Sequence, residues 1–383
     1  DNTMSKAAEL ANLIGNINAG GGGVNRNLLI NSAMNVSQRG TSLPFAHDGT
    51  TNAYLIDRWR FAINNTDELD GTFAQVADDP LGGDGYALKW TTGTAESAIA
   101  SNEYGYVTQK IEAKNLQHIQ NGNSNAKSLT LSFYVKSSIA GTFSVGLYKP
   151  DNTARQHNKT YTINSANTWE KKSVTFVGDT SGGGIDNDAG EGIWVSWNLF
   201  AGSDYKGGGS TSGWVNYANT MWADGLATDA VMTTAGATWL MTQCQLEIGQ
   251  NSTTFEHEPF SQTLEKCKRY YSEQFPPCGA GVTNGTSQLA RVNIPLEVEM
   301  RTAPTISISG NIYVYSGTHA STFSSLAQTW ATPKKIEIDA TSAGTMQSGN
   351  GQGLAIYNET SSSGTINVAK SESGGGLKFD AEL

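Results

Sequence analysis

Apolar and polar residues alternate along most of the chain, and this pattern predicts β-strands. In the stretch from residue 237 to 248, Leu240, Cys244 and Ile248 fall on one side of an extended chain and Met241 on the other. A period of two residues is typical of a strand with a buried face. The same alternation, interrupted by turns rich in Gly, Asn and Asp, predicts ten more strands upstream: 27–37, 54–63, 72–77, 86–92, 104–113, 127–136, 141–149, 159–163, 169–177 and 192–200. So many antiparallel strands without intervening helices indicate a β-sandwich, and long connections between them favour a jelly roll.

Helical periodicity flanks this strand-rich region on both sides. Within residues 4–18, one stripe of a short helix collects the apolar side chains Ala7, Leu10, Leu13, Ile14 and Ile17. A stripe on so short a helix cannot bury itself, so two interpretations are open: a coiled-coil seam around a symmetry axis, or a helix lying on its own β domain. A second helical pattern begins near Ser261 and is predicted to stop before Pro276-Pro277, because proline interrupts a helix.

Alternation resumes after the Pro-Pro pair in shorter segments. They predict strands at 288–299, 304–315, 334–340, 353–358 and 364–370. The predicted fold is therefore all-β, in four parts. These are an N-terminal helical oligomerisation or attachment segment with a Gly-rich joint (1–24), a large antiparallel jelly-roll β-sandwich (25–260), a linking helix (261–277) and a small C-terminal β-sandwich domain (278–383).

Charge and composition exclude several classes of partner. The 383 residues include 43 Gly and only 16% charged residues, with a formal net charge of −10. Binding to nucleic acid or to an anionic membrane surface needs clustered Lys and Arg, and the sequence has no such cluster. No apolar run approaches the roughly 20 residues that span a bilayer, so membrane insertion is not expected.

Few residues suggest chemistry. Cys244, Cys267 and Cys278 show no zinc-ligand spacing and imply no disulfide framework, and His257 lacks the second His of a zinc helix. No nucleophile elbow occurs, so we expect no catalytic residue, no cofactor and no metal. One acidic Gly-rich loop allows two interpretations, a calcium loop or a solvated turn; its acids are Asp179, Asp186, Asp188 and Glu191.

An aromatic segment between residues 194 and 222 is the strongest candidate for a binding site. It contains Trp194, Trp197, Tyr205, Trp214, Tyr217 and Trp222 in a long, irregular polar stretch. Sugars place their C–H faces on aromatic rings, so these six residues are the predicted glycan contacts. Trp194 and Trp197 are three residues apart and must face opposite sides of a strand, which predicts that one of them belongs to the core. Trp59 and Trp90 lie in dense apolar strands and are predicted to be buried.

Three short blocks carry a family resemblance: QLEIG (245–249), TTFE (253–256) and LEKCKRYY (264–271). In this order they resemble a signature of bacteriophage tail-fibre and virion-fibre proteins. The resemblance extends to NRNLLINSAMNVSQRGTS (25–42), YLIDRWRF (54–61), SLTLSFYVKSS (128–138), NTWEKKSVTFVGDTSGG (167–183), IPLEVEMRTAPTISISG (294–310) and KFDAEL (378–383). It implies a receptor-binding protein with a carbohydrate-binding-like jelly roll, present as a homotrimer in a virion that is assembled in the host cytoplasm and released.

Three functions are compatible with these features. The first is a non-enzymatic fibre or adhesin that attaches to other virion proteins through its N-terminal segment and binds a bacterial surface polysaccharide. The second is a purely structural connector, capsid-fibre or decoration subunit. The third is a glycan-active enzyme with an accessory binding module, which requires two carboxylates facing each other across a cleft.

Overall fold

The computed structural model describes residues 5–18, 25–46, 49–274, 280–283, 289–309, 313–316, 319–342, 354–357 and 376–383. Its contacts divide the chain into two compact units, residues 1–264 with Leu383 and residues 265–382. The division falls inside the predicted linking helix. The Gly-rich joint at residues 20–23 and the Pro276-Pro277 break lie outside the described residues.

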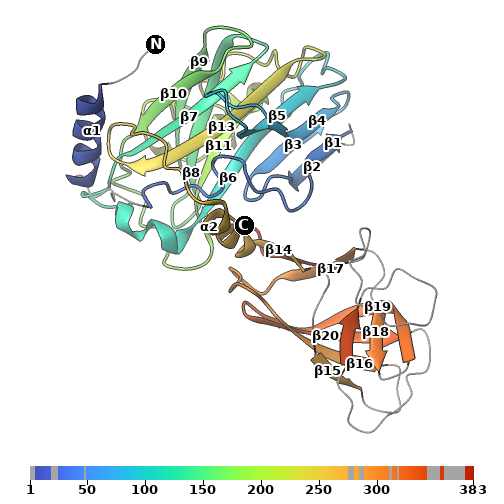
Figure 1. The fold of residues 1–383 in the computed structure, drawn as a ribbon. Coiled ribbons are helices and arrows are strands. Elements are labelled where there is room, and N and C mark those ends of the chain that lie inside the picture. The colour runs from blue at the N-terminus through green and yellow to red at the C-terminus, as the bar shows by residue number, and fades with distance from the viewer. Residues whose placement is uncertain are drawn as a thin grey trace. The chain divides into compact units, whose positions relative to one another are not determined.

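The first unit is a sandwich of two antiparallel sheets (Figure 1), as the alternation predicts. One sheet has six strands, in the order β1 (Ser42–Phe45), β4 (Gly71–Ala77), β5 (Tyr86–Thr92), β13 (Thr238–Ile248), β7 (Leu129–Ser137) and β10 (Glu170–Phe176). The other has seven, in the order β12 (Val215–Asn216), β9 (Arg155–Ile163), β8 (Gly141–Lys149), β11 (Glu191–Ala201), β6 (Tyr104–Glu112), β3 (Arg60–Thr66) and β2 (Gly49–Tyr54). A 3₁₀-helix, η1 (Ala113–Ile119), follows β6.

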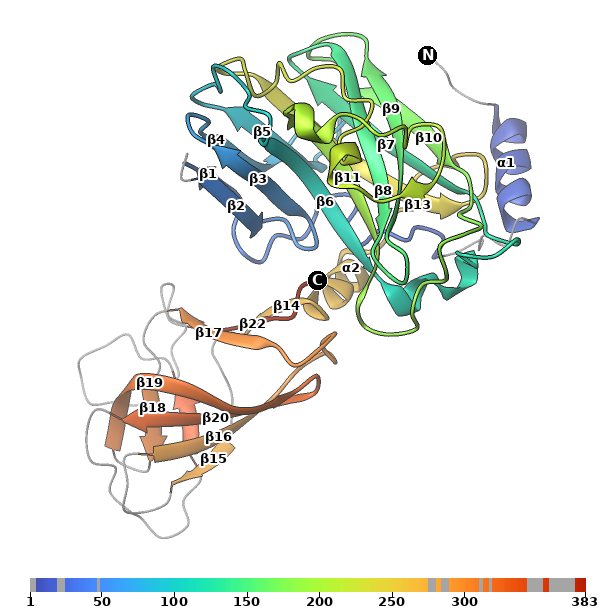
Figure 2. The same cartoon turned by 180° about the vertical axis from the view of Figure 1, so that it is seen from behind.

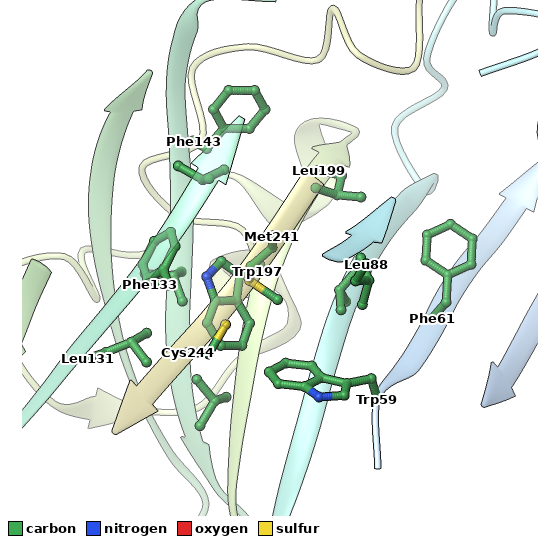
Figure 3. Packing of buried hydrophobic residues seen from close by; sticks show 14 of the residues in the cluster. Trp59, Phe61, Leu88, Leu131, Phe133, Phe143, Trp197, Leu199, Met241 and Cys244 are labelled. Atoms are coloured by element: carbon green, nitrogen blue, oxygen red, sulfur yellow. The ribbon is translucent and has the colours of Figure 1, made fainter. Parts of the chain in front are cut away.

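The core lies between the inner faces of the two sheets. Trp59, Trp90 and Trp197 are fully buried there, so the predicted burial of Trp59 and Trp90 is confirmed. Figure 3 shows Trp197 among Phe133, Met241 and other core residues, and its ring centroid lies 5.6 Å from that of Phe133. Edge-to-face aromatic packing of this kind adds to the stabilisation from burial.

The predicted strand at 27–37 is wrong, because this segment is irregular. Asn31 and Met34 have positive φ values of 55° and 59°, which lie outside the extended region of a regular strand. The buried Asn31 side chain donates to the carbonyls of Val36 and Asp57 and accepts from the Val36 amide. Its amide thus replaces the ladder bonds of a strand, while the alternating apolar residues still reach the core.

The blocks at residues 245–249 and 253–256 connect the last segment of the sandwich's sequence to its first segment, residues 25–27. The Glu256 carboxylate accepts hydrogen bonds from the backbone amides of Asn25, Arg26 and Asn27 at 2.7–3.0 Å. Glu247, which is 1% exposed, accepts from the amide and the hydroxyl of Thr253, each at 2.8 Å. We call these residues, 25–27 with 245–256, the terminal clasp.

The second unit combines a small sheet with a barrel. Helix α2 (Phe260–Lys268) leads into β14 (Tyr271–Gln274), which pairs with β22 (Gly376–Asp380), and β22 pairs with β17 (Thr305–Ser309). A closed barrel follows the order β15 (Ala280–Thr283), β16 (Leu289–Pro295), β20 (Lys335–Ser342), β19 (His319–Thr332), β18 (Tyr313–Ser316) and β21 (Leu354–Tyr357).

Three predictions for this unit need correction or lie outside the described residues. The C-terminal part is not a small sandwich: six of its strands close into a barrel, and three more form a separate small sheet. The linking helix ends at Lys268 and does not reach the Pro-Pro pair, because residues 271–274 pair as a strand. The strand predicted at 364–370 falls on residues that the structure does not describe.

Helix α1 (Lys6–Asn18) confirms the predicted N-terminal helix. Its side chains Leu10, Ile14 and Ile17 are 57%, 49% and 43% exposed in the single chain. In the part of the chain that the structure describes, neither α-helix is long and apolar enough to cross a membrane.

Candidate functional site

Aromatic side chains gather on the outer face of the seven-stranded sheet. Tyr104 and Tyr106 lie two residues apart on β6 and therefore share a face. On the neighbouring strands, Trp194 of β11 pairs directly with Tyr148 of β8, and their ring centroids are 5.5 Å apart. Outward positions of a sheet usually carry polar residues, so these rings need a cover or a ligand.

The cover is the long connection from β11 to β13, residues 202–237, which we call the β11–β13 loop. It contains β12 and two short 3₁₀ turns, η2 (Ser203–Tyr205) and η3 (Asn219–Met221). In Figure 2 this yellow-green segment lies over the strands of the sheet.

Buried amide side chains on the sheet hold the loop in place. Asn158 donates to the carbonyls of Met221 and Asp224, Gln156 to those of Met221 and Trp222, and Asn198 to that of Trp222. These bonds satisfy loop carbonyls that the sheet would otherwise leave without partners. The loop is thus fixed to the outer face by hydrogen bonds as well as by ring packing.

Sheet and loop together enclose a cavity of about 290 Å³. Its lining consists of seven aromatic residues with Pro150, Glu191 and Asn219; the seven are Tyr104, Tyr106, Tyr148, Trp194, Tyr205, Tyr217 and Trp222. The rings brace one another: Trp222 lies 5.1 Å from Tyr106 and 5.9 Å from Trp194, centroid to centroid. Trp222 is 7% exposed, so it forms a wall of the cavity and a part of the packing beneath the loop.

Charged groups position Trp194. The indole N–H donates to Glu191 Oε2 at 2.8 Å, and Lys110 Nζ donates to Glu191 Oε1 at 2.6 Å. The Lys110 ammonium also lies 3.9 Å from the centroid of the Trp194 ring, a cation–π contact. Burial lowers the pKa of Lys110, while the bond to Glu191 raises it. Together these contacts hold the indole in one orientation.

Four tyrosine hydroxyls of the cavity, those of Tyr104, Tyr106, Tyr148 and Tyr217, have a raised pKa and stay protonated at neutral pH. Burial raises the pKa of Tyr106 to about 12 and also raises the pKa of Tyr104, Tyr148 and Tyr217. A neutral phenol both donates and accepts a hydrogen bond. Tyr217 Oη already donates to Asn219 Oδ1 at 2.7 Å.

Four of the six predicted residues meet at this cavity: Trp194, Tyr205, Tyr217 and Trp222. Trp197 belongs to the core, as the three-residue spacing from Trp194 requires of one of the two. Trp214 lies elsewhere: its indole N–H donates to the Val177 carbonyl, and its ring packs against His157. Neither Trp197 nor Trp214 lines the cavity.

The other six lining residues were not among the predicted glycan contacts: Tyr104, Tyr106, Tyr148, Pro150, Glu191 and Asn219. Tyr104, Tyr106 and Thr108 lie at every second position of β6 and therefore on the same, outward face. Two of these three residues are large rings, although the outward face of a sandwich usually carries small polar residues. Because β6 is buried on both faces, this alternation alone does not separate the two tyrosines from core residues.

The acidic loop does not gather its four carboxylates. Asp179 forms an ion pair with Arg155 at 3.0 Å, Asp188 accepts from the Gly190 amide, and Glu191 bonds Trp194 and Lys110. Within the described residues, these acids do not form a cluster suited to a metal ion.

No protein-family model and no curated protein matches the chain. Among solved structures, the enzymatically active domain of tailspike protein 4 from bacteriophage CBA120 is similar at 10% identity and a TM-score of 0.31, covering 58% of this chain and 21% of that one. A family 11 carbohydrate-binding module from Clostridium thermocellum, in complex with a β-1,3-1,4-mixed-linked tetrasaccharide, is similar at 11% identity and a TM-score of 0.27, covering 57% of this chain and 98% of that one. Likenesses this weak support no functional inference, so the cavity has to supply one.

Proposed function

We propose that the cavity binds a pyranose unit of a bacterial surface polysaccharide, and that the protein is a non-enzymatic fibre or adhesin of a bacteriophage virion. The observation that carries the glycan proposal is the aromatic lining described above. Indole and phenol faces take the C–H faces of a sugar ring, while Glu191, Asn219 and the tyrosine hydroxyls are partners for its hydroxyl groups.

Lining chemistry also supports binding over catalysis. A glycoside hydrolase needs two carboxyl groups on either side of the scissile bond. Glu191 is the one acidic residue among those that line the cavity, and its two oxygens already accept from Trp194 and Lys110. A carboxylate with both oxygens engaged by donors suits orientation of a ligand better than proton transfer.

The adhesin role and the homotrimer extend this proposal to the whole particle. One sugar ring stacked on one indole contributes about 1–2 kcal/mol, at roughly 25 cal/mol per Å² of apolar area. Such a site is weak, and three copies on one fibre raise the avidity without any new contact. The exposed side chains of Leu10, Ile14 and Ile17 on α1 provide the apolar seam for such an assembly.

Replacing Trp194 with alanine should abolish most of the glycan binding of a single site. We expect affinity to fall about tenfold, the equivalent of about 1.4 kcal/mol, because the indole lines the cavity and its apolar contact area with the sugar would be lost. A glycan array with purified protein identifies the ligand, and calorimetry with the best oligosaccharide measures the change.

Trp214→Ala is the matched control, because it removes another half-buried tryptophan that lies outside the cavity. It should leave the affinity unchanged even if it lowers the melting temperature. Equal losses of affinity in both variants, or no binding to any glycan on the array, would contradict the proposed site.

The trimer is tested by mass. Sedimentation equilibrium at micromolar concentration should give three times the chain mass of 40.7 kDa. Leu10→Ser combined with Ile14→Ser should shift the mass toward one subunit, since both side chains belong to the proposed seam. Leu81→Ser, which changes a side chain that is 64% exposed outside α1, should not. A single-subunit mass for the unmodified protein would end the trimer proposal.

A further inference from the structure

Three acidic residues from two connections, the one after β3 and the one between β5 and β6, meet at one end of the sandwich. Asp67 directly follows β3, Glu96 lies in the connection from β5 to β6, and Glu103 directly precedes β6. One carboxylate oxygen of each lies within 4.8 Å of those of the other two. Glu96 and Glu103 are 1% and 2% exposed, whereas Asp67 is exposed and opens the cluster to solvent.

A buried carboxylate in this cluster has an unused oxygen. Glu103 Oε2 is buried and has no hydrogen-bond partner among the residues that the structure describes. Glu96 Oε2 accepts from the Leu69 amide at 3.2 Å, so that carboxylate is held in place. Leaving a buried carboxylate oxygen without a donor is costly, and a cation is the partner that such an oxygen takes in place of a donor.

We propose that Asp67, Glu96 and Glu103 form a binding site for one Ca²⁺ ion. Ca²⁺ takes carboxylate oxygens at about 2.3–2.6 Å, so two of its ligand oxygens are separated by up to about 5 Å. Oxygens within 4.8 Å of one another fit that coordination shell. Mg²⁺, with ligands at about 2.0–2.1 Å, demands a tighter octahedron.

The local electrostatics agree with this geometry. Burial, together with the nearby carboxylates of Glu96, Asp67 and Glu68, raises the pKa of Glu103 to about 7. Burial likewise raises the pKa of Glu96. Backbone amides offset part of this rise, but the charged side chains that raise the two pKa values are acidic, and a divalent cation would offset their repulsion.

The site is connected through the backbone to the aromatic cavity. The Glu103 carbonyl accepts from the Gly202 amide at 2.7 Å, at the start of the β11–β13 loop, and the next residue along the chain is Tyr104. Gly202 lies so close to this segment that an added Cβ would be 2.0 Å from the Ala100 carbonyl oxygen. A cation that fixes Glu103 therefore also fixes the start of β6 and the start of the β11–β13 loop, which border the cavity. This effect does not depend on which ligand the cavity binds.

Calcium titration of the full-length chain after EDTA treatment and desalting tests the site. We expect one CaCl2 equivalent to bind per chain, and a melting temperature that rises with the logarithm of the CaCl2 concentration. Glu103→Gln keeps the side-chain shape and should bind Ca²⁺ at least tenfold more weakly. Asp67→Asn, at an exposed position where folding is not at risk, should weaken binding as well.

Asp188→Asn is the control, since it neutralises an exposed acid outside the cluster and should titrate like the unmodified protein. Hydrogen exchange at residues 100–104 and 202–205 should slow when Ca²⁺ is added. The proposal is overturned if the unmodified protein shows no binding at millimolar CaCl2, if Glu103→Gln and Asp67→Asn bind as tightly as it does, or if MgCl2 stabilises it equally.

Discussion

Replacing Glu247 with alanine is expected to lower the free energy of unfolding of the sandwich by about 4 kcal/mol, since removing one partner of a buried ion pair leaves the other partner's groups unsatisfied. The carboxylate is 1% exposed and accepts three hydrogen bonds at 2.8 Å. Two come from the backbone amide and the hydroxyl of Thr253, and one comes from the side-chain amide of Gln245. Arg26 Nε lies 3.9 Å from Glu247 Oε2.

The position of Glu247 explains why the loss should be so large. The terminal clasp joins residues 25–27 to residues 245–256, which are more than 200 positions apart in the chain. Arg26 also donates to Thr253 and to the Thr254 carbonyl. Removing the carboxylate therefore disturbs several hydrogen bonds that share the same donors, and coupled bonds are lost together.

Urea unfolding followed by tryptophan fluorescence measures the effect, because eight of the nine tryptophans lie before residue 265. Glu247→Gln should lose less stability than Glu247→Ala, since the amide keeps one acceptor oxygen. Glu265→Ala removes an exposed carboxylate from α2 and should change stability by no more than about 0.5 kcal/mol. Equal stability of Glu247→Ala and Glu265→Ala would show that the clasp does not stabilise the fold.

Alternation predicts the strands well where a strand has one core face and regular neighbours. The predicted ranges 86–92 and 141–149 coincide with β5 and β8. It fails at 27–37, where apolar residues reach the core from a segment shaped by Asn31 and not by a ladder. It also misses β19, whose sequence HASTFSSLAQTWAT has too few apolar residues to show a period. Whether such a segment forms a strand depends on the strands it pairs with, which are far away in the sequence. A local pattern of apolar residues does not contain this information.

The candidate site was predictable only along the segment from Trp194 to Trp222. Tyr205, Tyr217 and Trp222 attract attention because rings are unusual in a polar, Gly-rich connection. Tyr106 does not, because β6 is buried on both faces: the core covers one and the β11–β13 loop the other. A strand covered on both sides has a near-continuous run of buried residues, so its outward tyrosine cannot be told from a core residue by pattern alone.

Lowering the pH from about 6.5 to about 4 should destabilise the protein through His157. This residue of β9 is 1% exposed, and neither ring nitrogen has a hydrogen-bond partner among the described residues. Burial, and then the nearby Lys159 ammonium, lowers the pKa of His157 from 6.5 to about 4. Between these two values the unfolded chain binds a proton that the folded chain does not, so stability falls as the pH falls.

The full contribution is about 3 kcal/mol, because each pKa unit of difference corresponds to about 1.4 kcal/mol. It is wholly present above pH 6.5 and is lost as the pH approaches 4. His157→Phe removes the titrating group while keeping a ring against Phe176 and Trp214, whose centroids lie 5.2 and 5.7 Å from that of His157. Urea unfolding of both proteins at pH 7.5 and pH 4.5 should therefore show a smaller acid-induced loss in the variant. Parallel losses in the two proteins would mean that His157 gains solvent or a partner in the folded state, and that other groups set the acid limit of stability.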